Sequence, residues 1–381
     1  MGFKTLHAPL LVLAFLAPMT FLVPVAQAAE MTKLQEMQED APPPPDPYAI
    51  IEQTTRDITL NPIDSDAYGK RAEAYYQLGQ LERALANLNI ALAINPNDSK
   101  YLQDRGIALR DLGDPSGAIH DFDSAIAIEP EYSDTYIERG LALYDIGKFQ
   151  EALADYTKAI SIDPLDDFAY NNRGNVFSIL GEWDSAFTDY NTAVALNPEN
   201  ANIRYNRARA SLNNNRFTAA LNDLDHVLQS TPDDVDARSL RADALIATGD
   251  DRAAVEDLNN VLALAPHNAG TWGKRGMARI RMGENEGGIN DLSNAIAIDP
   301  SAENYANRGN ASYQTGDYQK ALKDLTRALE IKPEFNQARF RRAETNEKLG
   351  NAGAAMEDYQ TAARHGSGQA KRLLKSRNTT K

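Results

Sequence analysis

The sequence predicts an all-α solenoid of about nine helix pairs, mainly because its prolines recur at a fixed period. Counted back from Pro96 and each later proline, the same residue types return: Arg at 25 residues, Gly or Ala at 24 and usually Ala at 5. Such a period indicates a stack in which each repeat buries its apolar face against its neighbours. The prolines lie 34 residues apart, except for a last step of 33: Pro62, Pro96, Pro130, Pro164, Pro198, Pro232, Pro266, Pro300 and Pro333.

One repeat, residues 133–166, shows why each should fold as two helices. Apolar and small residues recur at about one-turn spacing around Gly140 and again from Ala152, which predicts two amphipathic helices. Gly147 lies between them, where a helix ends in the left-handed conformation, and Asn215 holds that place in the fifth repeat. The closing proline prevents the second helix from continuing.

The period, the small residues, the alanines and the terminal proline together resemble the tetratricopeptide repeat, a helix-turn-helix module of 34 residues. The resemblance covers residues 65–369 and implies a right-handed superhelical solenoid of about nine repeats. The aromatic residue that the family favours early in the first helix is present as Tyr68, Tyr136, Tyr170, Trp272 and Tyr305, and is replaced by Leu102, Arg204, Arg238 and Arg339.

The N-terminal 28 residues predict a cleavable secretory signal. Lys4 precedes a mostly apolar stretch, 9–25, and the small-x-small pattern Ala26, Gln27, Ala28. An uncleaved N-terminal anchor is the alternative. The chain has no cysteine, which suits export to the bacterial periplasm, with secretion as the second choice.

The remaining parts flank the repeats. Residues 29–46 are rich in proline and acids and predict a disordered or extended linker. Residues 47–64 predict one helix that caps the first repeat. Residues 370–381 form a basic cap or tail, which is either a solvated terminus or a weak contact for an anionic lipid or acidic partner.

Composition argues against several functions. The formal net charge is −15, whereas nucleic-acid binding requires a basic surface. The histidines lack metal-ligand spacing and no phosphate-binding loop or nucleophile motif occurs, so we predict no metal, no cofactor and no catalytic residue.

Arginine and aspartate each hold one site in nearly every repeat. We predict an ion-pair ladder that fixes the register of stacking, because breaking a buried pair costs about 3–5 kcal/mol whereas an exposed pair contributes about 0–1. The arginines are Arg71, Arg105, Arg139, Arg173, Arg207, Arg241, Arg275, Arg308 and Arg342. Their partners are Asn87, Asp121, Asp155, Asp189, Asp223, Asp257, Asp291, Asp324 and Asp358.

The residues that vary between repeats predict a binding surface. By resemblance to the family, one face of each first helix lines a concave groove, and there amides could pair with the backbone of an extended peptide while Arg209 offers a fork for a carboxylate. An unselected polar face is the alternative. The candidates are Phe168, Asn171, Asn172, Asn175, Asn202, Tyr205, Asn206, Arg209, Asn307 and Asn310.

The seventh repeat is rich in glycine, and Gly288 replaces the packing alanine. We expect local softness or a change of pitch across residues 269–310, because glycine costs about 1 kcal/mol in a helix interior. The sequence thus predicts an exported scaffold that binds a protein or peptide in the groove. The alternative is a structural component of an envelope complex that associates with itself through its convex face and ends.

Overall fold

The structure, a computed structural model, describes residues 46–379. The predicted signal and all but the last residue of the predicted linker lie outside these residues. Every regular element between residues 46 and 379 is a helix, which confirms the all-α fold. None of these helices combines the length and apolarity that crossing a bilayer requires.

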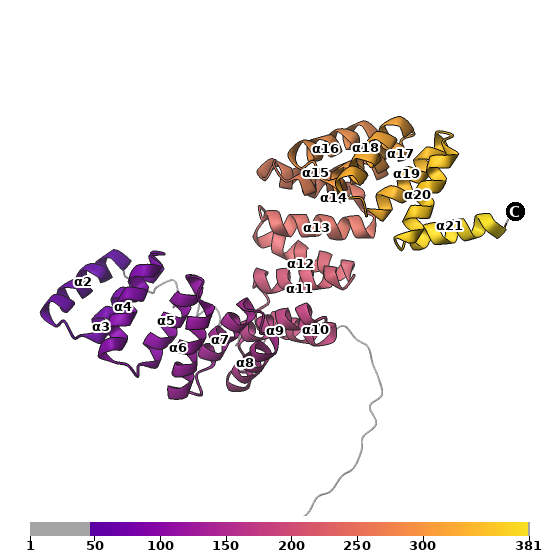
Figure 1. Cartoon of the computed structure of the whole chain (residues 1–381). Helices are drawn as coiled ribbons and strands as arrows, with labels where there is room; N and C mark the ends of the chain where they lie inside the picture. Colours follow the sequence, from indigo (N-terminus) through magenta and orange to yellow (C-terminus); the bar gives the residue numbers. More distant parts are fainter. Residues whose placement is uncertain (1–45, 380–381) are drawn as a thin grey trace, which may run out of the picture. The chain divides into compact units, whose positions relative to one another are not determined.

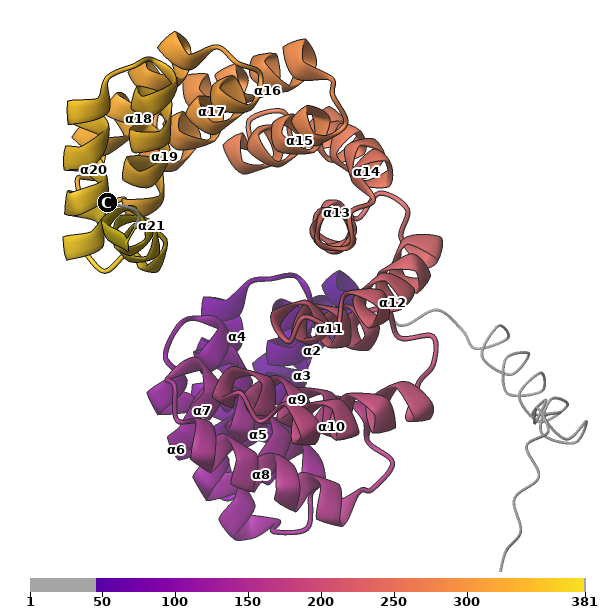
Figure 2. The ribbon, with the colours of Figure 1, turned by 90° about the vertical axis from the view of Figure 1, so that its right-hand side faces the viewer.

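The helices of the nine repeats alternate in the order that the period predicts (Figures 1 and 2). The first helices are α3 (Ser65–Gln77), α5 (Ser99–Asp111), α7 (Ser133–Asp145), α9 (Asp167–Leu180), α11 (Ala201–Asn213), α13 (Val235–Thr248), α15 (Ala269–Arg281), α17 (Ala302–Gln314) and α19 (Asn336–Lys348). The second helices are α4 (Leu81–Ile94), α6 (Pro115–Ile128), α8 (Phe149–Ile162), α10 (Trp183–Leu196), α12 (Phe217–Ser230), α14 (Asp251–Leu264), α16 (Asn285–Ile298), α18 (Tyr318–Ile331) and α20 (Ala352–Arg364).

Two further helices flank the repeats, α2 (Pro47–Leu60) before the first and α21 (Gly368–Thr379) after the ninth. The chain divides into two compact bodies, one ending at Ile94 and one beginning at Asn95. In the first body α3 packs against both α2 and α4. In the second, each first helix packs against its own second helix, and that second helix packs against the next first helix.

The turns within the repeats adopt the predicted conformation. Gly147 has φ +74° and Asn215 has φ +56°. Asn215 is the one described residue other than glycine with positive φ, which confirms that asparagine replaces glycine there to accept the left-handed geometry.

Small residues make room for large ones between the paired helices. A Cβ atom at Gly140 would lie 2.7 Å from Cε1 of Tyr156, a ring that is completely buried. The small residue therefore accommodates an aromatic ring of the second helix. Burying such a ring stabilises the third repeat by about 2 kcal/mol.

The glycines of the seventh repeat have a packing role. A Cβ atom at Gly276 would lie 2.9 Å from the carbonyl oxygen of Gly288, and one at Gly288 would lie 2.7 Å from Cγ1 of Ile280. The backbones of α15 and α16 therefore approach more closely than alanines would permit. The expected softness of residues 269–310 stays a prediction.

Candidate protein-binding face

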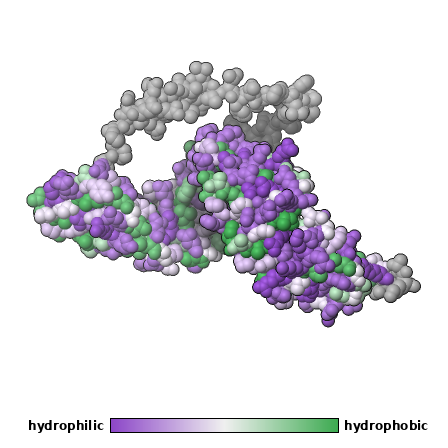
Figure 3. All heavy atoms as spheres, turned by 90° about the horizontal axis from the view of Figure 1, so that it is seen from above, coloured by the Kyte–Doolittle hydropathy of each residue, from purple (hydrophilic) through white to green (hydrophobic). Residues whose placement is uncertain are grey.

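The first helices form one face of the second body. Consecutive first helices contact each other along the stack, as α7 does with α9, α9 with α11 and α11 with α13. Side chains that vary between repeats lie on this face. Figure 3 shows hydrophilic residues over most of one side of the molecule, with hydrophobic residues scattered among them.

In the fourth repeat, the predicted amides are engaged within the protein. Asn172 is buried and donates its Nδ2 to the carbonyl oxygen of Phe168 at 2.9 Å. Asn175 accepts a hydrogen bond from the Tyr190 hydroxyl at 2.8 Å. Phe168 itself is 47% exposed. These amides do not form a free row; only part of their hydrogen-bonding capacity is available to a partner.

The fourth and fifth repeats are joined on this face. Asn206 of α11 donates its Nδ2 to Oδ1 of Asn171 in α9 at 3.1 Å, and Asn171 is buried. This bond uses one group from each amide and leaves Oδ1 of Asn206 as an acceptor. The two residues therefore link neighbouring first helices whether or not a partner is bound.

Arg209 is a predicted binding residue that is exposed and available to a partner. Its side chain is exposed, and it forms no hydrogen bond or ion pair with any residue between 46 and 379. Asn202, one turn before Asn206, is also exposed, and Tyr205 is half-buried. Burial raises the pKa of Tyr205 and the nearby Arg209 cation opposes that rise, so the tyrosine hydroxyl stays a donor at neutral pH.

The eighth repeat is linked in the same way as the fourth. Asn310 accepts a hydrogen bond from Nε of Arg341 in α19 at 2.9 Å. Asn307 is half-buried on α17. Asn310 thus has its acceptor occupied, as Asn175 does.

Two further contacts between first helices escaped the sequence reasoning. Lys274 of α15 pairs with Asp243 of α13 at 2.6 Å, and Arg110 of α5 pairs with Glu138 of α7 at 2.5 Å. Burial raises the pKa of Glu138, although Arg110 opposes the rise. Both pairs could have been predicted from the sequence, because their residues have opposite charges and are 31 and 28 positions apart, close to the length of one repeat.

The ladder arginines form the predicted pairs, and most of them reach a third helix as well. Nε and Nη2 of Arg139 donate to the carboxylate of Asp155 at 2.8 and 2.6 Å. Its Nη1 donates to Asp123, in the second helix of the preceding repeat, at 2.6 Å. Hydrogen bonding to Asp155 raises the pKa of Arg139. Asp155 is 5% exposed, so the guanidinium joins three helices around a buried carboxylate.

The same geometry recurs along the array. The structure pairs every ladder arginine named above with its predicted partner, including Arg71 with Asn87. The residue that accepts from Nη1 varies in type: Thr55, Asp123, Thr157, Asn191, Asp225, Asn259 and Ser293. That these pairs set the register of stacking stays a prediction.

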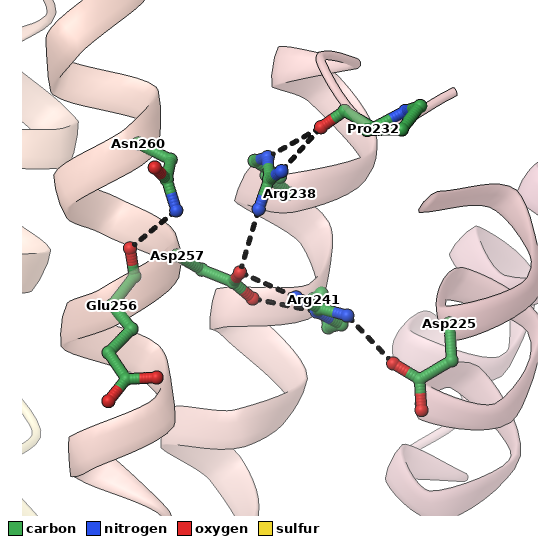
Figure 4. Close-up of polar contacts among 7 residues, drawn as sticks. All are labelled: Asp225, Pro232, Arg238, Arg241, Glu256, Asp257 and Asn260. Carbon is green, nitrogen blue, oxygen red and sulfur yellow. Dashed lines mark hydrogen bonds and ion pairs between the residues drawn. The ribbon is translucent and has the colours of Figure 1, made fainter. Parts of the chain in front are cut away.

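Arginine at the aromatic position preserves one hydrogen bond and adds an ion pair. Tyr136 donates its hydroxyl to the carbonyl oxygen of Pro130 at 3.0 Å. At the same position Nε of Arg238 donates to the carbonyl of Pro232 at 2.9 Å (Figure 4). Arg238 also lies 3.5 Å from the carboxylate of Asp257, beside the ladder arginine. The replacement therefore retains a donor six residues after the proline.

Models of tetratricopeptide families match the chain at several places. One described as TPR repeat matches residues 140–180 and 174–215, and others described as tetratricopeptide repeat match 65–98, 205–269 and 302–335. Together they cover more than half of the sequence. The chain belongs to the tetratricopeptide-repeat family.

The chain is similar in fold to several solved structures. The chain is similar to PilW, a type IV pilus biogenesis factor, with 20% identity and a TM-score of 0.51 over 54% of this chain and 94% of that one. It is also similar to a tetratricopeptide repeat protein from Parabacteroides merdae, with 24% identity and a TM-score of 0.48 over 65% and 98% of the chains. A third, from Thermus thermophilus, has 27% identity and a TM-score of 0.42 over 48% and 99%. No curated protein matches the chain.

The tetratricopeptide-repeat fold makes this chain a scaffold of the kind used in protein interactions. No group of three or more His, Asp or Glu residues that could hold a metal ion occurs between residues 46 and 379.

Proposed function

We propose that this protein is an exported, periplasmic adaptor that binds an extended segment of a partner protein on the first-helix face of repeats four and five. Arg209 supports this proposal most directly. It is an exposed cation without a partner among the residues the structure describes, whereas Lys274 and Arg341 on other first helices are paired.

The surroundings of Arg209 suit a carboxylate. Tyr190 occupies the Oδ1 acceptor of Asn175, which leaves Nδ2 of Asn175 to donate. Burial raises the pKa of Tyr190 and the Arg209 cation lowers it, so the tyrosine stays neutral beside the guanidinium. A guanidinium fork and an amide donor together can hold the two oxygens of an acidic side chain or a chain terminus.

The backbone of the bound segment has acceptors and donors beside this anchor. Oδ1 of Asn206 and the exposed amide of Asn202 lie on the same helix face as Arg209. Phe168 supplies exposed apolar area on the adjoining helix. An exposed aromatic ring next to polar donors is a common anchor for peptide recognition.

Capture from a periplasmic extract tests this proposal. Immobilised wild type is compared with Arg209→Ala, and with Arg252→Ala as the matched control, because Arg252 is exposed on the second helix α14. We expect Arg209→Ala alone to lose the bound proteins, and synthetic peptides from the captured segments to bind about tenfold more weakly to it, or about 1.4 kcal/mol. Equal capture by all three proteins would contradict the proposal that the partner binds on the first-helix face of repeats four and five.

Export is tested separately. We expect the protein in the periplasmic fraction with Ala29 as its first residue, since cleavage follows Ala28 in the predicted signal. A chain that keeps its first residues and sediments with membranes would support the uncleaved anchor. A cytoplasmic chain would refute export.

A further inference from the structure

The flanking helix α2 has the properties of a second helix. It has 14 residues and ends two residues before Pro62, as α4 ends two residues before Pro96. Thr55 of α2 accepts from Nη1 of Arg71, which lies 16 residues later. The second helices of complete repeats supply the acceptor at this same spacing. Thus α2 is the second helix of an incomplete repeat.

The sequence before α2 departs from the first-helix pattern. At 25 and 24 residues before Pro62 stand Met37 and Gln38, where the nine repeats have arginine followed by glycine or alanine.

The face of α2 that would contact such a helix differs from every complete repeat. Asp57 stands five residues before the proline, where the nine repeats bury alanine or valine, and Asp57 is half-buried. Leu60 is 86% exposed, whereas Ile128 and Ile331 at the same position are 41% and 42% exposed. This face combines uncovered apolar area with a carboxylate.

The helix α21 offers the complementary surface. It packs on α20 in the place of a following first helix, with Leu373 and Leu374 against the cluster around Tyr359. Its Lys371 and Arg372 are exposed. The sequence from residue 364 to 381 contains six basic residues and no acid, whereas residues 46–94 contain seven acids and four bases.

We propose that α21 of one copy packs against the open face of α2 in a second copy, with Lys371 and Arg372 facing Asp57. The two helices then complete one repeat, and copies associate head to tail. Of the possible occupants of α2, this one supplies both a helix of the first-helix class and the opposite charge. The association uses the ends of the array and is independent of the first-helix face.

Sedimentation equilibrium over a concentration series tests the proposal with two charge-reversal variants of the full chain. One carries Lys371→Glu with Arg372→Glu, the other Asp57→Lys, and Arg252→Glu serves as the control. We expect wild type and the control to associate as concentration rises. Each end variant alone should associate at least about tenfold more weakly, or about 1.4 kcal/mol.

Mixing the two end variants distinguishes charge pairing from misfolding. In the mixture each reversed end finds an oppositely reversed partner, so association should return to the wild-type level, while circular dichroism confirms that each variant is helical. A wild type that stays a single chain at all concentrations overturns the proposal. It is equally overturned if the mixture associates no more than the separate variants.

Discussion

Replacing one ladder arginine should cost more where the aspartate has no second arginine. Arg173 donates Nε and Nη2 to Asp189 at 2.7 and 2.8 Å, and Asp189 is 3% exposed. Arg173→Leu would leave that carboxylate buried and unpaired. A broken buried pair costs about 3–5 kcal/mol, and the lower value applies because the arginine side chain is 18% exposed.

The seventh repeat provides the matched comparison. There Arg275 and Arg279 both donate to Asp291, Arg279 at 2.9 Å. Arg275→Leu leaves one charge-assisted hydrogen bond in place, so its cost should be about half, or roughly 1.5 kcal/mol. The double variant Arg173→Leu with Asp189→Leu should recover to within about 1 kcal/mol of wild type, because an apolar pair can replace a buried ion pair.

Native-state hydrogen exchange is the suitable measurement, because a repeat array unfolds locally and a single unfolding free energy is not well defined. Amides of α9 and α10 should lose protection in Arg173→Leu, and amides of α15 and α16 should lose less in Arg275→Leu. The reasoning is refuted if Arg173→Leu leaves exchange unchanged or if the two single variants lose equal protection.

Three further predictions test other contacts. Tyr136→Phe should lower the opening free energy of the α7 and α8 amides by about 1 kcal/mol in native-state hydrogen exchange, because it loses the hydrogen bond to the proline carbonyl. Gly288→Ala should cost about 1–3 kcal/mol in its own repeat through overpacking, whereas Gly353→Ala, with no atom within 4 Å of the added Cβ, should be neutral or slightly stabilising by the same assay. The raised pKa of Glu138 means that the folded state binds its proton more tightly than the unfolded state. Relative to Glu138→Gln, wild type should therefore lose stability around α7 as pH rises from the ordinary pKa of glutamate through the raised one, in hydrogen exchange at a series of pH values.

The architecture was accessible from sequence because it depends on local rules. Gly147 and Asn215 predicted the turns because few other residues adopt positive φ, and the prolines predicted where second helices stop. The ladder pairs could also be predicted, since Arg139 and Asp155 keep one spacing in all repeats. A repeated spacing fixes both partners at once.

The availability of the candidate amides could not be predicted in the same way. Whether Asn171 is free depends on Asn206, 35 residues away on the adjoining helix, and that pair occurs in one place. The role of Arg238 was hidden for a different reason. Its guanidinium donates to the carbonyl oxygen of Pro232, as the hydroxyl of Tyr136 donates to that of Pro130. The two residue types are chemically unlike, so the sequence does not show that they make the equivalent hydrogen bond.

The hydrogen bond from Nη1 of the ladder arginines affects whether a whole repeat can be removed from the array. It donates to Asp123, Thr157 or Asn191, each sixteen residues earlier, so this contact between repeats does not require one particular type of acceptor residue. Excising residues 167–200 would bring Arg207 sixteen positions after Thr157, an acceptor that Arg173 already uses. This contact of the junction would therefore survive the loss of a whole repeat, whereas the hydrogen bond from Asn206 to Asn171 would be lost.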